Sequence, residues 1–261
     1  MMKVVAVANQ KGGVGKTTTS VNLSAALAAM DKRVLLVDLD PQGNASVSVG
    51  INKGELVAST YELLVEAQPL EEVALSLPRL RMDVVPANGD LTAAEVALLA
   101  MEDREQRLNL ALQAGTEKYD FVIIDCPPSL NMLTLNALVA ANSVLITMQC
   151  EYFALEGLSA LLETINTINQ TVNPALRIEG ILRTLYDPRN ALTNEVSEQL
   201  HQHFEGLVYR TVIPRNVRLA EAPSHGLPGI VYDRLARGAT AYMALAGEFM
   251  RRQEHHPRDN I

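Results

Sequence analysis

Short apolar runs alternate along the chain with segments of helical spacing. The runs are rich in β-branched residues, which is typical of strands in a parallel sheet covered by helices on both faces. They predict strands at residues 3–8, 33–38, 82–86, 120–125, 143–148, 178–185 and 208–213, with a weaker run at 229–232. This alternation predicts an α/β fold, with three layers and a mostly parallel, twisted sheet.

Two of the intervening segments carry apolar stripes at helical spacing, which core packing explains. They are Leu155, Leu158, Leu162, Ile165 and Ile168, and then Val196, Leu200 and Phe204. Residues 126–150 hold no charged side chain, but prolines and asparagines interrupt them. We therefore expect a loop, a helix and a buried strand there, not a membrane span.

No repeat, low-complexity tract or long linker marks a domain boundary in the 261 residues. We expect a single domain over residues 1–252, because a chain of this length with 48% hydrophobic residues can bury a full core. The remaining residues, 253–261, are polar enough to predict a disordered tail.

The charge balance is acidic, with 30 acidic and 22 basic residues and a net charge of −8. It provides no overall attraction to nucleic acid or to anionic lipid, so any such binding requires a local basic patch. The two cysteines, Cys126 and Cys150, form no CxxC pair. Buried thiols in a reducing cytoplasm are the simplest interpretation of them.

Residues 9–20, NQKGGVGKTTTS, follow the first predicted strand and open a predicted helix. Glycines at this position let backbone N–H groups approach phosphates at a helix N-terminus. Lys16 is then expected to reach the β- and γ-phosphates, with the Thr17 hydroxyl on Mg²⁺. The strict pattern GxxxxGK[ST] is not met, because Gln10 replaces its first glycine and a second lysine, Lys11, follows. The residues expected to bind the nucleotide are Lys11, Gly12, Gly13, Val14, Gly15, Lys16, Thr17 and Thr18.

Aspartates end two other predicted strands, where α/β sheets place their ligand chemistry. Asp125 ends the run DFVIID and is expected to act on Mg²⁺ through a water molecule. Position 126 is a cysteine instead of a second carboxylate, so Asp40 is the candidate that orients the attacking water. Asp38 has two interpretations: it caps the next turn, or it supports the metal or its water from outside the coordination sphere.

The motifs KGGVGKT, DLDPQGN, DCPPS, EYFALEGL and IPRNVRLAEAPSHG cover nearly the whole chain. Together they resemble the deviant Walker-A ATPases of the ParA/MinD superfamily, and specifically its chromosomal ParA (Soj) branch. The resemblance implies a P-loop NTPase fold that binds ATP and Mg²⁺. It also implies a face-to-face homodimer in which Lys11 contacts the phosphates of the ATP held by the other subunit. Such a lysine supplies a cation to the transferred phosphoryl group, as an arginine finger does elsewhere.

The guanine-reading NKxD sequence does not follow the later predicted strands, which favours ATP over GTP. The family resemblance places the adenine near the loop after TVIP, with Pro214 and Asn216 as its neighbours.

The resemblance further implies that the ATP-bound dimer binds double-stranded DNA without sequence preference. Arg189 and Arg218 match positions that the family uses for DNA, and Arg210 and Arg215 are further candidates. Cations suffice for contacts with backbone phosphates. The alternative is that these arginines are solvated or paired with acids such as Glu221.

Three functions are compatible with these patterns. The first is a DNA-partitioning ATPase on the nucleoid, whose hydrolysis a centromere-binding ParB-type protein stimulates. The second, a MinD-like membrane ATPase, requires a lipid-binding amphipathic C-terminal helix, but the chain ends in polar residues and a proline. The third is a metabolic enzyme with the same loop, such as a carboxylate-activating ligase or an iron–sulfur carrier. The missing cysteine pair counts against the carrier.

Overall fold

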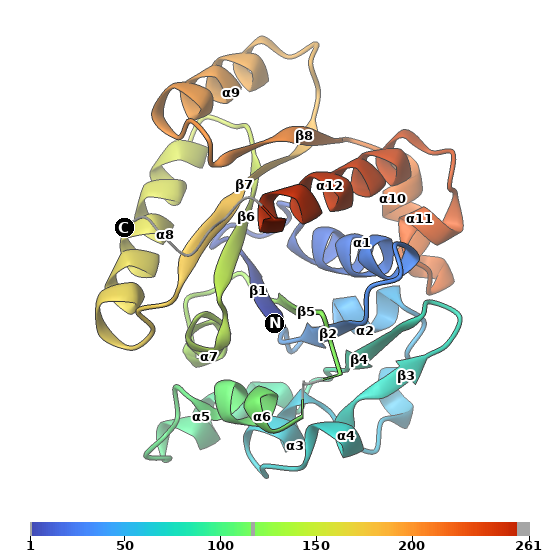
Figure 1. Ribbon diagram of the computed structural model, residues 1–261, viewed down its shortest axis with the longest axis vertical. Helices are drawn as coiled ribbons and strands as arrows, with labels where there is room; N and C mark the ends of the chain where they lie inside the picture. Colours follow the sequence, from blue (N-terminus) through green and yellow to red (C-terminus); the bar gives the residue numbers. More distant parts are fainter. Residues whose placement is uncertain (1, 116–117, 255–261) are drawn as a thin grey trace.

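The computed structural model describes residues 2–115 and 118–254. Its strands are β1 (Lys3–Ala8), β2 (Val34–Asp38), β3 (Leu75–Leu77), β4 (Met82–Val85), β5 (Phe121–Asp125), β6 (Ser143–Gln149), β7 (Arg177–Tyr186) and β8 (Val208–Pro214). They form one eight-stranded sheet in the order β3-β4-β2-β5-β1-β6-β7-β8 (Figure 1). Neighbouring strands are parallel, except that β3 pairs with β4 in the antiparallel direction.

Helices connect these strands and cover both faces of the sheet. They are α1 (Lys16–Ala29), α2 (Asn44–Ser48), α3 (Thr60–Leu64), α4 (Leu70–Val73), α5 (Leu91–Leu99), α6 (Arg107–Gly115), α7 (Met132–Ala140), α8 (Ala154–Thr171), α9 (Ala191–His203), α10 (Val217–Glu221), α11 (Gly229–Tyr232) and α12 (Arg237–Glu254). Two 3-10 turns, η1 (Lys53–Glu55) and η2 (Ala222–His225), complete the connections.

Alternate residues of each central strand enter two separate cores. In β1, Val4 and Ala6 pack on the side of α3 to α9, whereas Val5 and Val7 pack against α1 and α12. This two-residue period follows from the pleat of a strand, which points successive side chains to opposite faces. Figure 1 shows α1 and α12 side by side over the second core. The predicted three-layer fold is confirmed.

Seven of the predicted strands are confirmed, and their ends differ from the prediction by at most one residue. The prediction of a strand at residues 229–232 is wrong, because these residues form the single helical turn α11. Pro228 precedes the turn, and its carbonyl accepts from the N–H groups of Val231 and Tyr232. The sequence reading also missed β3, whose sequence LSL is too short to show a strand pattern although two of its residues are leucines.

The loop, helix and strand expected between residues 126 and 150 are confirmed as the loop before α7, α7 itself and β6. The predicted tail begins too early, because α12 continues through Gln253 and Glu254. Gln253 is held in place by donating to Glu179 at 2.6 Å and accepting from Lys3 at 2.5 Å. The other tail residues, 255–261, lie outside the described residues.

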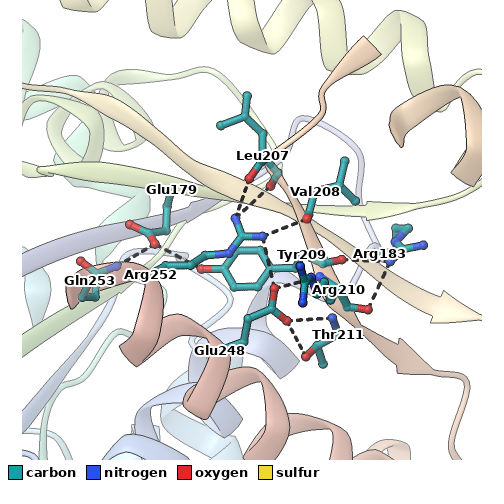
Figure 2. Close-up of polar contacts among 11 residues, drawn as sticks. Glu179, Arg183, Leu207, Val208, Tyr209, Arg210, Thr211, Glu248, Arg252 and Gln253 are labelled. Carbon is teal, nitrogen blue, oxygen red and sulfur yellow. Dashed lines mark hydrogen bonds and ion pairs between the residues drawn. The ribbon is translucent and has the colours of Figure 1, made fainter. Parts of the chain in front are cut away.

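Side chains of α12 satisfy the backbone of the last strand, β8. The Glu248 carboxylate accepts from the backbone N–H groups of Arg210 and Thr211, both at 2.8 Å, and from the Thr211 hydroxyl at 2.7 Å. One turn later, Arg252 donates to the Val208 carbonyl at 2.9 Å and lies 3.9 Å above the Tyr209 ring. Figure 2 shows this network between strand and helix. A Glu–Arg pair four residues apart thus fastens α12 to β8.

Glu248→Gln should lower the free energy of unfolding by roughly 1–3 kcal/mol at pH 7, because an amide replaces a charged acceptor of buried N–H groups. Burial alone would raise the pKa of Glu248, but hydrogen bonds from Thr211 and Arg210 lower it below its ordinary value. The stability that charged Glu248 contributes is therefore fully present above its unfolded pKa of about 4.3, and it is lost as the pH falls through the folded pKa. Urea unfolding at pH 7 and at lower pH measures this difference.

The matched control is Glu205→Gln, which changes an exposed glutamate beside the same strand. Its unfolding curve should coincide with that of the unaltered protein. If the stability difference for Glu248→Gln persisted unchanged well below pH 4, charge on Glu248 would not be its cause.

Candidate functional site

The candidate site lies where the carboxyl ends of β1, β2 and β5 meet. The loop of residues 9–15 leaves β1 and enters α1 at Lys16. Asp38 and Asp125 end the adjacent strands β2 and β5 and lie opposite each other in the register. The sheet thus brings the predicted phosphate loop and two of the predicted aspartates together.

Two glycines give the loop its shape. Gly13 has φ of 74° and Gly15 has φ of 81°, in the left-handed region that side chains with a Cβ rarely adopt. Gly15 is also the residue that precedes α1. The loop therefore ends on the free N–H groups of a 14-residue helix, an arrangement that favours anions.

Lys16, the first residue of α1, is only 7% exposed. Its Nζ donates to the carbonyl of Lys11 at 3.1 Å, so the ammonium group spans the loop. Burial lowers the pKa of Lys16, and the nearby Asp125 partly opposes this effect. The lysine predicted to bind phosphates therefore lies inside the curve of the loop, beside the buried aspartates.

Two side chains that the sequence reading missed connect the loop to other strands. Asn9 accepts from the N–H of Lys11 at 2.9 Å and donates to the Thr147 carbonyl in β6 at 2.7 Å. The hydroxyl of Thr184, buried in β7, donates to the Val14 carbonyl at 2.7 Å. These contacts join residues up to 170 positions apart, so local sequence carries no signal for them.

Thr184→Val should weaken ATP binding roughly tenfold, because it removes one buried hydrogen bond that positions the loop. Thr184→Ser keeps the hydroxyl and should restore the affinity. Thr147→Val is the matched control, since the Thr147 hydroxyl is equally buried and has no hydrogen-bond partner among the described residues. Calorimetric titration with an ATP analogue measures all three. Equal affinities for Thr184→Val and Thr147→Val would contradict a positioning role.

Asp125 is fully buried at the end of β5. Its Oδ1 accepts from the Ser20 hydroxyl at 2.8 Å, whereas Oδ2 has no partner in the part of the chain that the structure describes. Burial, and next the neighbouring Asp38, raise the pKa of Asp125. A cation or its water would satisfy the orphaned oxygen, so the site fits the predicted Mg²⁺. Within residues 2–115 and 118–254, no group of three acidic, His or Cys residues could hold a metal alone. This is compatible with Mg²⁺ bound largely by water and phosphate.

Asp38 and Asp40 differ in their surroundings. Asp38 is fully buried, and its Oδ2 accepts from the N–H and the hydroxyl of Ser46 at 2.8 and 2.7 Å. Burial raises the pKa of Asp38 although these hydrogen bonds oppose it. Asp40 lies in the following turn, where its Oδ1 accepts from the N–H of Gln42 at 2.9 Å. Asp38 thus bonds to α2 through Ser46 and to the turn after β2 through the N–H of Asp40, at 3.3 Å.

Lys11 forms an ion pair with Glu151, which follows β6. Both side chains are about half exposed, at 50% and 42%. Glu151 belongs to the motif EYFALEGL and was not predicted as a site residue. The cation of Lys11 is therefore displayed at the surface of the subunit and not turned toward its own loop.

The two residues predicted near the adenine follow at the end of β8. Pro214 ends the strand, and Asn216 caps α10 by accepting from the N–H of Leu219 at 3.3 Å. The sequence reading had assigned no capping role to Asn216.

The arginines predicted for DNA are exposed and, in two cases, paired with acids. Arg189 makes a two-pronged contact with Asp187, at 2.9 and 2.8 Å. Arg218 contacts Glu221 at 2.8 Å and Asp233 at 3.5 Å. The expected alternative of a pair with Glu221 therefore applies to Arg218. Arg210 lies on β8 and Arg215 directly follows that strand.

A groove of about 990 Å³ lies between α9, β8 and α12, away from the phosphate loop. Arg210 is the one predicted site residue that lines it. Its polar floor is the network of Figure 2, where Glu248 and Arg252 already bond to the strand. We assign no ligand to this groove.

Comparison with known proteins gives a consistent result. A family model described as AAA domain matches residues 2–178. The sporulation initiation inhibitor protein Soj of Bacillus subtilis is 52% identical over 248 residues, which are 95% of this chain and 98% of that protein. The chromosome partitioning protein ParA of Caulobacter vibrioides is 46% identical over 254 residues, 97% and 95% of the two chains. A crystal structure named cobyrinic acid a,c-diamide synthase from Mycobacterium smegmatis, with bound ADP and magnesium, has a TM-score of 0.86 and 39% identity over 98% of this chain and 96% of that one.

Proposed function

Because the chain belongs to the ParA/Soj family of chromosome-partitioning ATPases, it hydrolyses ATP, and we propose that it uses this reaction to control DNA binding. In this proposal the ATP-bound homodimer binds double-stranded DNA without sequence preference. Hydrolysis, stimulated by a ParB-type centromere-binding protein, releases the protein from the DNA. The protein then acts in the cytoplasm, on the nucleoid.

The observation that carries the proposal is that Lys16 spans the phosphate loop within electrostatic reach of the buried Asp125, whose Oδ2 has no hydrogen-bond partner among the described residues. Lys16 and the N–H groups of residues 12–18 bind the β- and γ-phosphates. The Thr17 hydroxyl and, through water, Asp125 hold Mg²⁺, which neutralises phosphate charge when bound. Asp40 orients the attacking water, and Asp38 keeps the turn that carries Asp40 in place.

Lys11 acts in trans in this proposal. Its ammonium leaves Glu151 and stabilises the charge on the phosphates held by the other subunit. The ion pair with Glu151 is exposed, so breaking it costs about 1 kcal/mol or less.

We assign DNA binding to Arg189 and Arg218, with Arg210 and Arg215 as further contributors. The acids now paired with Arg189 and Arg218 are solvent-screened partners, which phosphates of a duplex can replace. A dimer presents two copies of each arginine, so binding should be much tighter in the ATP state. This explains how a chain of net charge −8 binds DNA in one state.

Arg189→Glu and Arg218→Glu should each reduce ATP-dependent cosedimentation with DNA and flatten its salt dependence, by a log–log slope of about 0.9 per lost phosphate contact. Dimerisation with ATP should persist, and unrelated DNA sequences should give the same result. The matched control is Arg33→Glu, since Arg33 also makes a two-pronged contact with an acid, Asp120. Arg33 precedes β2 and therefore lies at the amino ends of the strands, away from Arg189 and Arg218. Unchanged DNA binding in both arginine variants would contradict the assignment of DNA binding to this surface.

Two other functions compete with this proposal. A membrane-binding role needs a free amphipathic helix, but the apolar face of α12 packs in the core through Tyr242, Leu245 and Phe249. No helix of the described residues is long and apolar enough to cross a membrane. The name of the Mycobacterium smegmatis structure raises an amide-forming activity. Hydrolysis of ATP by the purified protein without any added carboxylate distinguishes partitioning from that activity.

A further inference from the structure

An apolar groove of about 420 Å³ lies between α7 and α8, and we call it the α7–α8 groove. Leu138 and Ile168 are buried and form its floor, whereas Leu130 at the rim is 44% exposed. Its volume falls within the range of about 300–1,000 Å³ that is usual for binding pockets. Contiguous exposed apolar surface of this kind often marks an interaction site. The apolar lining consists of Leu130, Met132, Leu135, Leu138 and Ile168.

The walls of the α7–α8 groove carry charge of one sign. The segments that form them, residues 126–140 and 154–171, contain two glutamates and no lysine or arginine. A third carboxylate lies at the mouth, where Glu95 of α5 accepts from the side chain of Asn131 at 2.5 Å. Asn131 itself lines the groove. An anionic lipid surface or a nucleic acid is therefore repelled here, whereas a basic partner is attracted.

The length of the groove suits one face of a helix. Met132 and Leu138 belong to α7, and their positions along the helix axis differ by about 9 Å. In a partner helix, side chains at positions i, i+3 or i+4, and i+7 share one face over about 10 Å. Two or three apolar side chains of one helix can therefore enter the groove together, which is a recurring mode of peptide recognition.

We propose that the α7–α8 groove binds an amphipathic helical segment of a partner protein. The apolar face of this segment enters the groove, and its lysines or arginines lie beside the carboxylates of the walls and mouth. The apolar contacts form the core of the interface, and the charges select the partner. A second copy of this chain is a poorer occupant, because its net charge is −8. The inference does not depend on DNA binding or on the reaction with ATP.

The first test measures binding of a model peptide of about 14 residues, which form roughly four helical turns. The peptide has leucines on one helix face, lysines on the other and one tryptophan among the leucines. The protein has no tryptophan, so the emission comes from the peptide alone and should shift to the blue on binding. One control peptide has glutamates in place of the lysines, and another has the original residues in scrambled order. Both should bind at least about tenfold more weakly.

Thr167→Lys tests where the peptide binds. Thr167 lines the groove, is exposed, and donates its hydroxyl to the carbonyl of Glu163 at 2.9 Å. A lysine there should weaken binding of the basic peptide at least about tenfold, because it places a like charge in the mouth. The matched control is Thr240→Lys. Thr240 is also exposed and makes the same bond to Ala236 at 3.2 Å, but it belongs to α12 on the opposite face of the sheet. The affinity of Thr240→Lys should stay within about twofold of the original.

Met132 provides a signal from within the groove. It is the one methionine among the described residues that lines the groove. In protein labelled with ¹³C at the methionine methyl groups, the Met132 resonance should move as the basic peptide is added, and Met132→Leu assigns that resonance. The resonance of Met243, which lies in α12, should not move.

The outcomes decide the inference in either direction. Circular dichroism and thermal unfolding should show that both lysine variants are folded. Equal affinities of the folded Thr167→Lys and Thr240→Lys proteins for the basic peptide would overturn the inference. Equal binding of the scrambled peptide, or an unchanged Met132 resonance at saturation, would overturn it as well. If the unaltered protein self-associates without peptide in light scattering, and Thr167→Lys abolishes this association, the groove belongs to a second copy and the proposed partner is wrong.

Discussion

Lys16→Ala should reduce ATP hydrolysis by roughly 100- to 1000-fold, the usual cost of losing one preorganised donor to a developing charge. ATP binding should fall as well, because in the proposed mechanism Lys16 bonds the phosphates before and during the reaction. Among the described residues, its Nζ has one hydrogen-bond partner, a loop carbonyl at 3.1 Å, so we do not expect the core to depend on it. Measured rates of phosphate release and calorimetric titration with ATP test both parts.

The control for this result is Lys118→Ala. Lys118 is exposed, precedes β5 at the amino end of the strands and pairs with Asp83 of β4. The rate of ATP hydrolysis by Lys118→Ala should equal that of the unaltered protein. Circular dichroism and thermal unfolding should show that Lys16→Ala is folded. A folded Lys16→Ala variant with the original rate would remove this lysine from the reaction.

Asp40→Ala should lower hydrolysis by roughly 100- to 10,000-fold, the range expected when a positioned general base or water-orienting group is lost. ATP affinity should change little, because Asp40 contacts no phosphate in the proposed mechanism. The variant should therefore accumulate as an ATP-bound dimer. Single-turnover kinetics and light scattering measure the two effects.

Asp40→Asn separates the carboxylate from its hydrogen bond. The amide oxygen can still accept from the N–H of Gln42, so the turn should keep its shape. Hydrolysis should nevertheless remain low, since an amide is a poor base. If Asp40→Asn hydrolyses ATP at the original rate, the turn geometry matters and the carboxylate does not. A strictly monomeric Asp40→Ala protein would contradict the proposed sequence of binding, dimerisation and hydrolysis.

The central strands were predictable because burial on both faces leaves continuous apolar runs, as in β5 and β6. The errors occurred where the run was short. Residues 229–232, GIVY, are apolar enough for a strand, but the proline before them and the four-residue length suit a helical turn. The three residues of β3 include two leucines, but a run of three is too short to show the period of a strand.

The candidate site was predictable to the extent that its residues are local. The glycines, Lys16 and the aspartates at strand ends belong to contiguous motifs. Asn9, Thr184 and Glu151 were missed because their roles depend on which strands become neighbours, and sheet order is not written in local sequence. The ion-pair partners of the arginines include one that is close in sequence and one that only the fold brings close. The acid next to Arg189 is two residues away, whereas Asp233 reaches Arg218 through the fold.

The fastening of β8 by Glu248 and Arg252 bears on solubility. A strand at the border of a sheet offers unpaired N–H and C=O groups to any similar strand of another molecule, which is a common start of aggregation. Here α12 bonds to backbone N–H and C=O groups of the border strand β8. The strand at the opposite border, β3, has only three residues. If copies of the protein gather at high local concentration on DNA, as proposed, these contacts protect them from joining sheet to sheet, and association through side-chain surfaces is favoured instead.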